Sequence, residues 1–428
     1  MLNSNNEYKK TYPINYDKIL LSNETKTQYS IINLLTMKKT NQKIKVLFNL
    51  AIKNHQQNDY ESAATNYEKI LKIEPNHFGT NFSFGSLLIE AKKFEKAKKL
   101  LENSIRINPN FAKAQHNLGL IFYHLEKFEN AIKCYEKAIK IEPGYNNAHQ
   151  ALGAILKKQK DYKNAIDHFK KVNSKNSRSQ ILECLYLSND FNAYKKMLEE
   201  LTEHDPLNIR VATFSTYVSA KKKIKNIYPF CKNPLKFFFN TNLINEIHDS
   251  NIFLDRILKS LKKKKSVWEP FSKTTVKGSH TSNNIFNTED PNIFKLKKLI
   301  EQKINFFQKN YKFSDDYFIK KWPLKTSLHA WHVKLVNQGH QKSHIHDSGW
   351  LSGVFYLKLP KVLSKDEGSI KLMLYGYDFP EDDNLPCLIY SPKAFDLILF
   401  PSSLFHQTIP FNSEEERHCI AFDLKPKF

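Results

Sequence analysis

Cysteine is scarce in this sequence and follows no motif. The chain has five cysteines in 428 residues, and none stands in a Cys-x-x-Cys pair. Their number is odd, so a fully paired disulfide framework is not expected. Scattered thiols of this kind are typical of a reducing compartment, where they pack in cores or have no special role.

Long apolar segments are absent as well. The first ten residues, MLNSNNEYKK, lack the apolar core of a secretory signal peptide. The longest apolar runs, such as the three phenylalanines at residues 237–239, are far too short to cross a bilayer. We therefore expect a cytoplasmic protein with no membrane span.

Acidic residues are outnumbered by basic ones. Lys and Arg total 66 against 43 Asp and Glu, which gives a formal net charge of +23. Such a balance is typical of proteins that bind nucleic acids or anionic membranes. Here the lysines are spread along the whole chain, and no basic patch or nucleic-acid motif stands out. A nucleic-acid partner is therefore not expected.

The N-terminal half contains a repeat with a period of 34 residues. Residues 1–43 are polar and aperiodic, and we expect a disordered leader there. From about residue 44, five columns of residues recur in phase: Ala63, Ala97, Ala131 and Ala165; Tyr60, Phe94, Phe128 and Tyr162; Pro75, Pro109 and Pro143; Gly85, Gly119 and Gly153; and Tyr67, Leu101, Tyr135 and Phe169. This pattern resembles tetratricopeptide repeats, which are pairs of helices.

The repeat region is expected to be a solenoid over residues 44–226. Each helix pair cannot bury its apolar face alone, so neighbouring pairs must stack. We count four full repeats, near 44–77, 78–111, 112–145 and 146–179, then a shortened fifth and a capping helix. The resemblance implies that a protein or peptide binds in the concave groove, where candidate positions are Asn81, Gln115, Asn117 and His149. A scaffolding role without substrate contact is the alternative.

The pattern changes after the repeats, and we predict a second domain over residues 231–428. Two helical segments come first, at residues 241–265 and 292–311. Short apolar, strand-like segments follow, at residues 327–335, 350–359, 369–374, 395–400 and 419–424. This order indicates an antiparallel jelly roll with helices on one face, and so an α+β multidomain chain.

Three histidines in this second domain have the spacing of metal ligands. His344 and His346 stand at i and i+2, so on a strand their side chains point to the same face. His406 follows about sixty residues later, after a second strand-like segment. Three such ligands that leave coordination positions open are typical of a mononuclear non-haem iron site.

The residues around these histidines resemble the 2-oxoglutarate- and Fe(II)-dependent oxygenases. The resemblance rests on Trp331-x-Val333, Gly339, His344-x-His346, the run at 350–357, Phe400-Pro401-Ser402, and His406 with Arg417. The closest group of these oxygenases is often carried on bacterial tetratricopeptide-repeat proteins. The resemblance implies a double-stranded β-helix, Fe(II) as the metal, and 2-oxoglutarate and O2 as co-substrates.

The resemblance implies a role for each site residue. His344 and His406 match the two histidine ligands, and His346 stands at the position of the usual carboxylate ligand. Arg417 matches the basic residue that holds the far carboxylate of 2-oxoglutarate, a task that suits the planar guanidinium. We predict that His344, His346 and His406 are the metal-binding and catalytic residues and that Arg417 binds the co-substrate.

The His-x-His sequence leaves alternatives open. Asp347 would replace one of the first two ligands if the strand bulged there. Three-histidine iron sites also occur in dioxygenases that use no 2-oxoglutarate. The domain could also be a catalytically degenerate oxygenase fold in a repeat protein that only binds partners. We favour a 2-oxoglutarate-dependent dioxygenase, a hydroxylase, with repeats that recruit a protein or peptide.

Overall fold

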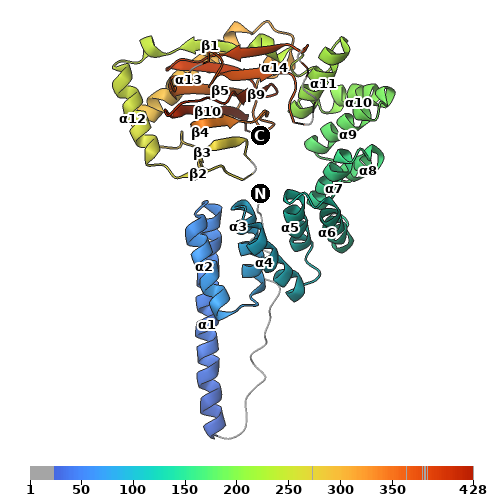
Figure 1. The fold of residues 1–428 in the computed structure, drawn as a ribbon, viewed down its shortest axis with the longest axis vertical. Helices are drawn as coiled ribbons and strands as arrows, with labels where there is room; N and C mark the ends of the chain where they lie inside the picture. The colour runs from blue at the N-terminus through green and yellow to red at the C-terminus, as the bar shows by residue number, and fades with distance from the viewer. Residues whose placement is uncertain are drawn as a thin grey trace. The chain divides into compact units, whose positions relative to one another are not determined.

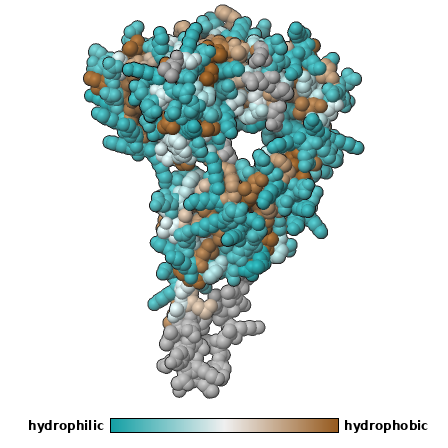
Figure 2. Space-filling view, in the orientation of Figure 1, coloured by the Kyte–Doolittle hydropathy of each residue, from teal (hydrophilic) through white to brown (hydrophobic). Residues whose placement is uncertain are grey.

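The computed structural model describes residues 24–271, 273–362, 364–377, 379, 382 and 384–427, with side chains described from residue 35 onward. The chain forms two compact units, Met1–Ile155 and Leu156–Phe428. The boundary falls inside helix α7 (Asn146–Lys158). Most of the surface visible in Figure 2 is hydrophilic, and no helix in the described part of the chain is both long and apolar enough to cross a membrane.

The first unit is built from antiparallel helix pairs (Figure 1). Before α7, its helices are α1 (Glu24–Gln56), α2 (Tyr60–Ile73), α3 (Phe78–Glu90), α4 (Phe94–Ile107), α5 (Ala112–His124) and α6 (Phe128–Ile141). Residues 1–23 of the expected leader lie outside the described residues. Residues 24–43 differ from that expectation, because they form the first part of α1 and continue into the first repeat helix.

The recurring residues explain why the pairs pack so closely. Gly119 on α5 faces the ring of Tyr135 on α6, and a Cβ at residue 119 would lie 2.6 Å from that ring. Tyr135 is itself buried, as are its counterparts in the same column, Tyr67, Leu101 and Phe169. Any side chain at residue 119 would therefore push the two helices apart.

Three of the four predicted groove residues have structural partners: Asn117, which donates to Ser86 at 2.8 Å, and also Asn81 and His149. Asn81 donates hydrogen bonds from its amide to the carbonyl oxygens of Pro75 and His77, at 2.9 and 3.0 Å. Two repeats later, His149 lies 2.9 Å from the carbonyl oxygen of Pro143. Both side chains are buried and bind the turn that precedes their own helix, so they tie successive helices together.

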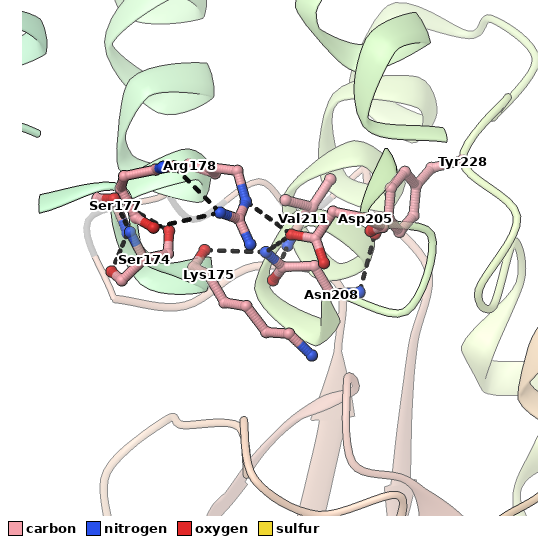
Figure 3. Close-up of polar contacts among 9 residues, drawn as sticks. Ser174, Lys175, Ser177, Arg178, Asp205, Asn208, Val211 and Tyr228 are labelled. Carbon is pink, nitrogen blue, oxygen red and sulfur yellow. Dashed lines mark hydrogen bonds and ion pairs between the residues drawn. The ribbon is translucent and has the colours of Figure 1, made fainter. Parts of the chain in front are cut away.

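The second unit begins with the end of α7 and four more repeat helices: α8 (Tyr162–Val172), α9 (Lys175–Leu187), α10 (Phe191–His204) and α11 (Ile209–Lys222). A polar network joins the start of α9 to the turn before α11 (Figure 3). Arg178 donates to Asp205 at 2.8 Å, and Asn208 donates to both Asp205 and the carbonyl of Lys175. The Tyr228 hydroxyl reaches the backbone of Asp205 and Asn208, so the chain that leaves α11 is fixed to the same turn.

Two antiparallel sheets follow in this unit. The seven-stranded sheet has the order β1-β8-β5-β10-β4-β3-β2, and the three-stranded sheet has the order β7-β6-β9. The strands are β1 (Phe239–Asn242), β2 (Ser266–Trp268), β3 (Thr275–Thr281), β4 (Thr326–Gln341), β5 (Leu351–Lys358), β6 (Ile370–Met373), β7 (Cys387–Tyr390), β8 (Asp396–Pro401), β9 (Phe405–Thr408) and β10 (Arg417–Pro426). The helices here are α12 (Ser250–Lys262), α13 (Pro291–Asn310) and α14 (Tyr317–Lys320).

Alternation along the central strands separates two cores. On β10, Ile420 and Phe422 pack in one buried cluster with residues of α12 and α13. Cys419 and Ala421 face the other way and pack with Ile370 and Leu372 of the smaller sheet. The larger sheet thus has helices on one face and the smaller sheet on the other (Figure 1).

The predicted fold class is confirmed: a helical-repeat solenoid precedes an antiparallel β-sheet domain, in an α+β multidomain chain. The boundaries at residues 44–226 and 231–428 stay a prediction. The boundary between the two compact units falls within the fourth repeat. The last repeat helices belong to the second unit, and α11 packs in the same buried cluster as the β-sheet domain.

Candidate metal centre

Three histidines from two segments of the chain meet between the two sheets. His344, His346 and His406 each offer a ligand atom, and these atoms all lie within 4.8 Å of one another. His344 and His406 are buried, with 9% and 5% of their surface exposed. The predicted ligands are therefore brought together, in the only group of this kind found among the described residues.

Backbone pairing positions the three rings. His344 lies between β4 and β5 rather than inside a strand, and it forms an isolated antiparallel bridge with His406 on β9. Two residues on, the amide of His346 donates to the carbonyl of Ser402 at 3.1 Å. The i, i+2 spacing therefore acts as on a strand, because this segment is extended and paired.

The hydrogen bonds of the rings determine which nitrogen is available. Nδ1 of His344 lies 2.7 Å from the carbonyl of Lys342, and Nδ1 of His406 lies 3.2 Å from the carbonyl of Leu404. Nδ1 of His346 lies 2.5 Å from Oδ1 of Asp423. Each acceptor holds a proton on Nδ1, so each ring presents an unprotonated Nε2, the form that binds metals.

Burial keeps two of the histidines, His344 and His406, neutral. It lowers the pKa of His344 to about 3, with a further contribution from the nearby His346. Burial, and then His344 and His346, hold the pKa of His406 well below its usual value. Neutral rings are ready to accept a cation without first losing a proton.

Asp347 does not join this group. Its carboxylate lies 2.9 Å from Nε of Arg210 on α11, and half of the Asp347 side chain is exposed. Consecutive residues of an extended segment point in opposite directions. The alternative in which Asp347 replaces a histidine therefore has no support in the geometry.

Arg417 lies in the same cavity as the histidines, with only 2% of its surface exposed. Its guanidinium donates to the carbonyl of Gly368 at 3.2 Å and lies over the ring of Tyr356, 5.1 Å from the ring centre. Among the described residues no carboxylate pairs with Arg417. A buried cation without a carboxylate partner is costly in a free protein, and an anionic ligand would remove that cost.

Two further polar groups in the cavity lack partners among the described residues. They are the hydroxyl of Tyr356 and the indole N–H of Trp331, both buried. The remaining wall is mainly apolar, with Val354, Ile370 and Phe400. The cavity thus offers a cation and two buried donors that lack partners among the described residues.

Sequence reasoning missed part of the support around the histidines. Oγ of Ser352 lies 2.8 Å from Asp423 and 2.8 Å from Oγ of Ser402, and all three side chains are buried. Burial alone would raise the pKa of Asp423, but His346 and the hydrogen bond from Ser352 outweigh it and hold that pKa below its usual value. His332, the neighbour of Trp331 in the chain, is not in the cavity lining and pairs with His418 at 3.0 Å.

Comparisons with known proteins agree with this organisation. The family described as "Putative 2OG-Fe(II) oxygenase" matches residues 329–423, and tetratricopeptide-repeat families match residues 55–118, 112–145 and 147–174. No curated protein matches the chain.

Similar solved structures include two MamA structures and one of PilF. One MamA structure is 19% identical, covers 38% of this chain and 92% of its own, and has a TM-score of 0.35. MamA from Desulfovibrio magneticus RS-1, from residue 41 onward, is 32% identical, with 30% and 73% covered and a TM-score of 0.29. PilF of Pseudomonas aeruginosa is 14% identical, with 43% and 86% covered and a TM-score of 0.38.

The family models thus identify two parts of the chain. Residues 55–174 carry tetratricopeptide repeats, and residues 329–423 form a domain that matches the family described as "Putative 2OG-Fe(II) oxygenase".

Proposed function

We propose that this protein is an Fe(II)- and 2-oxoglutarate-dependent dioxygenase whose repeats recruit a protein or peptide. The observation that carries the proposal is that the buried Arg417, which has no carboxylate partner among the described residues, lies in the same cavity as the three clustered histidines. When bound, Fe(II) with 2-oxoglutarate and O2 supplies hydroxylation of a C–H bond, with decarboxylation of the co-substrate to succinate.

The residues of the chain divide the work of binding between them. His344, His346 and His406 would hold the metal through Nε2, leaving the remaining positions open. Arg417 would pair with the far carboxylate of 2-oxoglutarate, and the free hydroxyl of Tyr356 would donate to the same group. The apolar wall would exclude water, which strengthens both interactions.

The repeats support the proposed recruitment of a partner, and the cysteines support a proposed location in the cytoplasm. Tetratricopeptide repeats generally mediate protein–protein interactions, so a protein or peptide is the expected partner. All five cysteines are free in the structure, as expected of a protein in the reducing cytoplasm.

Loss of a single ligand tests the enzymatic proposal. With Fe(II), 2-oxoglutarate, O2 and ascorbate, which supplies the two electrons that a substrate would otherwise give, we expect the wild-type protein to form succinate slowly without substrate, and His406→Ala to form none. His340→Ala is the matched control, because His340 lies on β4 outside the cavity lining. Equal succinate formation by His406→Ala and the wild-type protein would overturn the assignment.

One observation favours a different function. His346 occupies the position of the usual carboxylate ligand, so the metal site has no direct anionic ligand. A three-histidine dioxygenase without 2-oxoglutarate, or a catalytically degenerate domain in a partner-binding repeat protein, would share that feature. Iron binding with no affinity for 2-oxoglutarate would support these alternatives.

A further inference from the structure

We propose that Asp423 is the carboxylate of this metal centre, acting on the metal through His346 rather than as a direct ligand. The inference rests on the proposed metal site and explains how a His-x-His sequence would hold a divalent cation. Asp423 would be a positioning residue, since it would touch neither the metal nor a substrate.

Asp423 is a buried carboxylate that pairs closely with His346. Its Oδ1 lies 2.5 Å from Nδ1 of His346, and only 4% of the Asp423 surface is exposed. The other two histidines donate from Nδ1 to backbone carbonyls, which are neutral. His346, at the position of the usual carboxylate ligand, is therefore the one ligand of the three with an anionic partner.

The surroundings hold this carboxylate in place. Ser352, directly opposite Asp423 in the β5–β10 register, donates to the same Oδ1 at 2.8 Å. Gly349 provides the space, because a Cβ there would lie 3.2 Å from Cγ of Asp423 and 2.6 Å from Oγ of Ser402. A larger residue at 349 would displace the carboxylate or the serine.

The arrangement has a clear chemical consequence. A carboxylate that accepts the Nδ1 proton fixes the tautomer and orientation of the imidazole and makes its Nε2 more basic. Part of the negative charge is thereby transmitted to the metal, although all three direct ligands are neutral. A ferric ion gains more from this charge than a ferrous ion, so the carboxylate should lower the Fe(III)/Fe(II) potential.

The test separates charge from shape. Asp423→Asn keeps an acceptor oxygen for Nδ1 and removes the charge, whereas Asp347→Asn removes a nearby charge that faces Arg210 instead. We would titrate metal-free full-length protein with Co(II), followed by its visible absorption, and measure the potential of the iron-loaded protein by spectroelectrochemistry. Circular dichroism would establish that each variant is folded.

We expect Asp423→Asn to bind Co(II) roughly 10- to 100-fold more weakly and to have a raised potential. A tenfold greater loss of affinity for Fe(III) than for Fe(II) corresponds to a rise of about 59 mV. Asp347→Asn should leave both quantities unchanged. Wild-type affinity and potential in Asp423→Asn, or an equal change in Asp347→Asn, would overturn the inference.

A second variant decides the matter if Asp423→Asn does not fold. Ser352→Ala removes a donor from the carboxylate and leaves more of its charge for His346, so the potential should fall, opposite to the effect of Asp423→Asn. An unchanged or raised potential in Ser352→Ala would count against the inference. If the wild-type protein binds no Co(II), the metal centre itself is wrong; if the wild-type protein binds and the variants match it, only the role of Asp423 is wrong.

Discussion

Two buried side chains of the β5–β10 pair, Tyr356 and Arg417, lack the partners that burial ordinarily requires. The Tyr356 hydroxyl has no hydrogen-bond partner among the described residues, and Arg417 has no carboxylate. Unsatisfied buried polar groups reduce the stability of a free protein and are typically kept for binding. At the residue scale, these are the two groups that the proposed function assigns to the far carboxylate of 2-oxoglutarate.

Tyr356→Phe distinguishes a role of the Tyr356 hydroxyl in binding 2-oxoglutarate from a role in folding. We expect the affinity for 2-oxoglutarate to fall by roughly 2- to 10-fold, because one hydrogen bond of about 0.5–1.5 kcal/mol is lost. The ligand-free protein should unfold at the same or a higher temperature, since the variant removes an unsatisfied group. Calorimetric titration and thermal unfolding measure the two effects; unchanged affinity would exclude Tyr356 from the co-substrate site.

The sequence predicted the ligand cluster but not its support. His344, His346, His406 and Arg417 stand in a spacing that signals a site, and the structure brings them into one cavity. Asp423 ends an apolar run that reads as an ordinary buried strand, and its partner His346 is 77 residues away in the chain. The period of two along β10, with polar residues 417 and 423 on one face, is the signal that would have found it.

A buried ion pair links helices at the scale of elements. Lys157 at the end of α7 donates to Glu183 on α9 at 2.7 Å, and only 8% and 7% of these side chains are exposed. Ser179 also donates to Glu183, at 3.2 Å. Such a pair adds little net stability compared with apolar residues, yet loss of one partner leaves an uncompensated charge in the interior.

Lys157→Met should therefore destabilise the second unit, Leu156–Phe428, by roughly 3–5 kcal/mol at neutral pH. The double variant Lys157→Met/Glu183→Met should recover most of this lost stability. Burial raises the pKa of Glu183, and removal of Lys157 raises it further. At low pH the carboxyl is neutral in the folded and unfolded states of both proteins, so the deficit should grow as the pH rises through the raised pKa that Glu183 has in the folded wild-type protein. Denaturant unfolding at pH 4.5 and 7 measures it; a deficit independent of pH would contradict this account.

Strong periodicity made some elements predictable and others not. The helix predicted at 292–311 and the strand predicted at 350–359 correspond closely to α13 (Pro291–Asn310) and β5 (Leu351–Lys358). Strands β2 and β7 have only three and four residues, and β3 carries Lys277 and His280 among its small residues. Short or polar strands owe their conformation to partners distant in sequence, which no local pattern records.

At the scale of the whole molecule, positive charge is abundant and spread along the sequence. The formal net charge is +23, and most of the surface visible in Figure 2 is hydrophilic. We expect any binding to duplex DNA to be independent of sequence and to disappear by roughly 200 mM salt, because only diffuse phosphate contacts would be available. Fluorescence anisotropy measures this; binding that resists salt would reveal a nucleic-acid site that the chain's patterns do not indicate.

Anaerobic titration of the Fe(II)-loaded protein with 2-oxoglutarate tests the central claim most directly. The account predicts the visible charge-transfer absorption of an iron-chelated 2-oxo acid in the wild-type protein. In Arg417→Ala the same absorption should be lost or require much more 2-oxoglutarate, because the far carboxylate has no cation to pair with. Iron binding without this absorption in the wild-type protein would contradict the account and favour a three-histidine or partner-binding role.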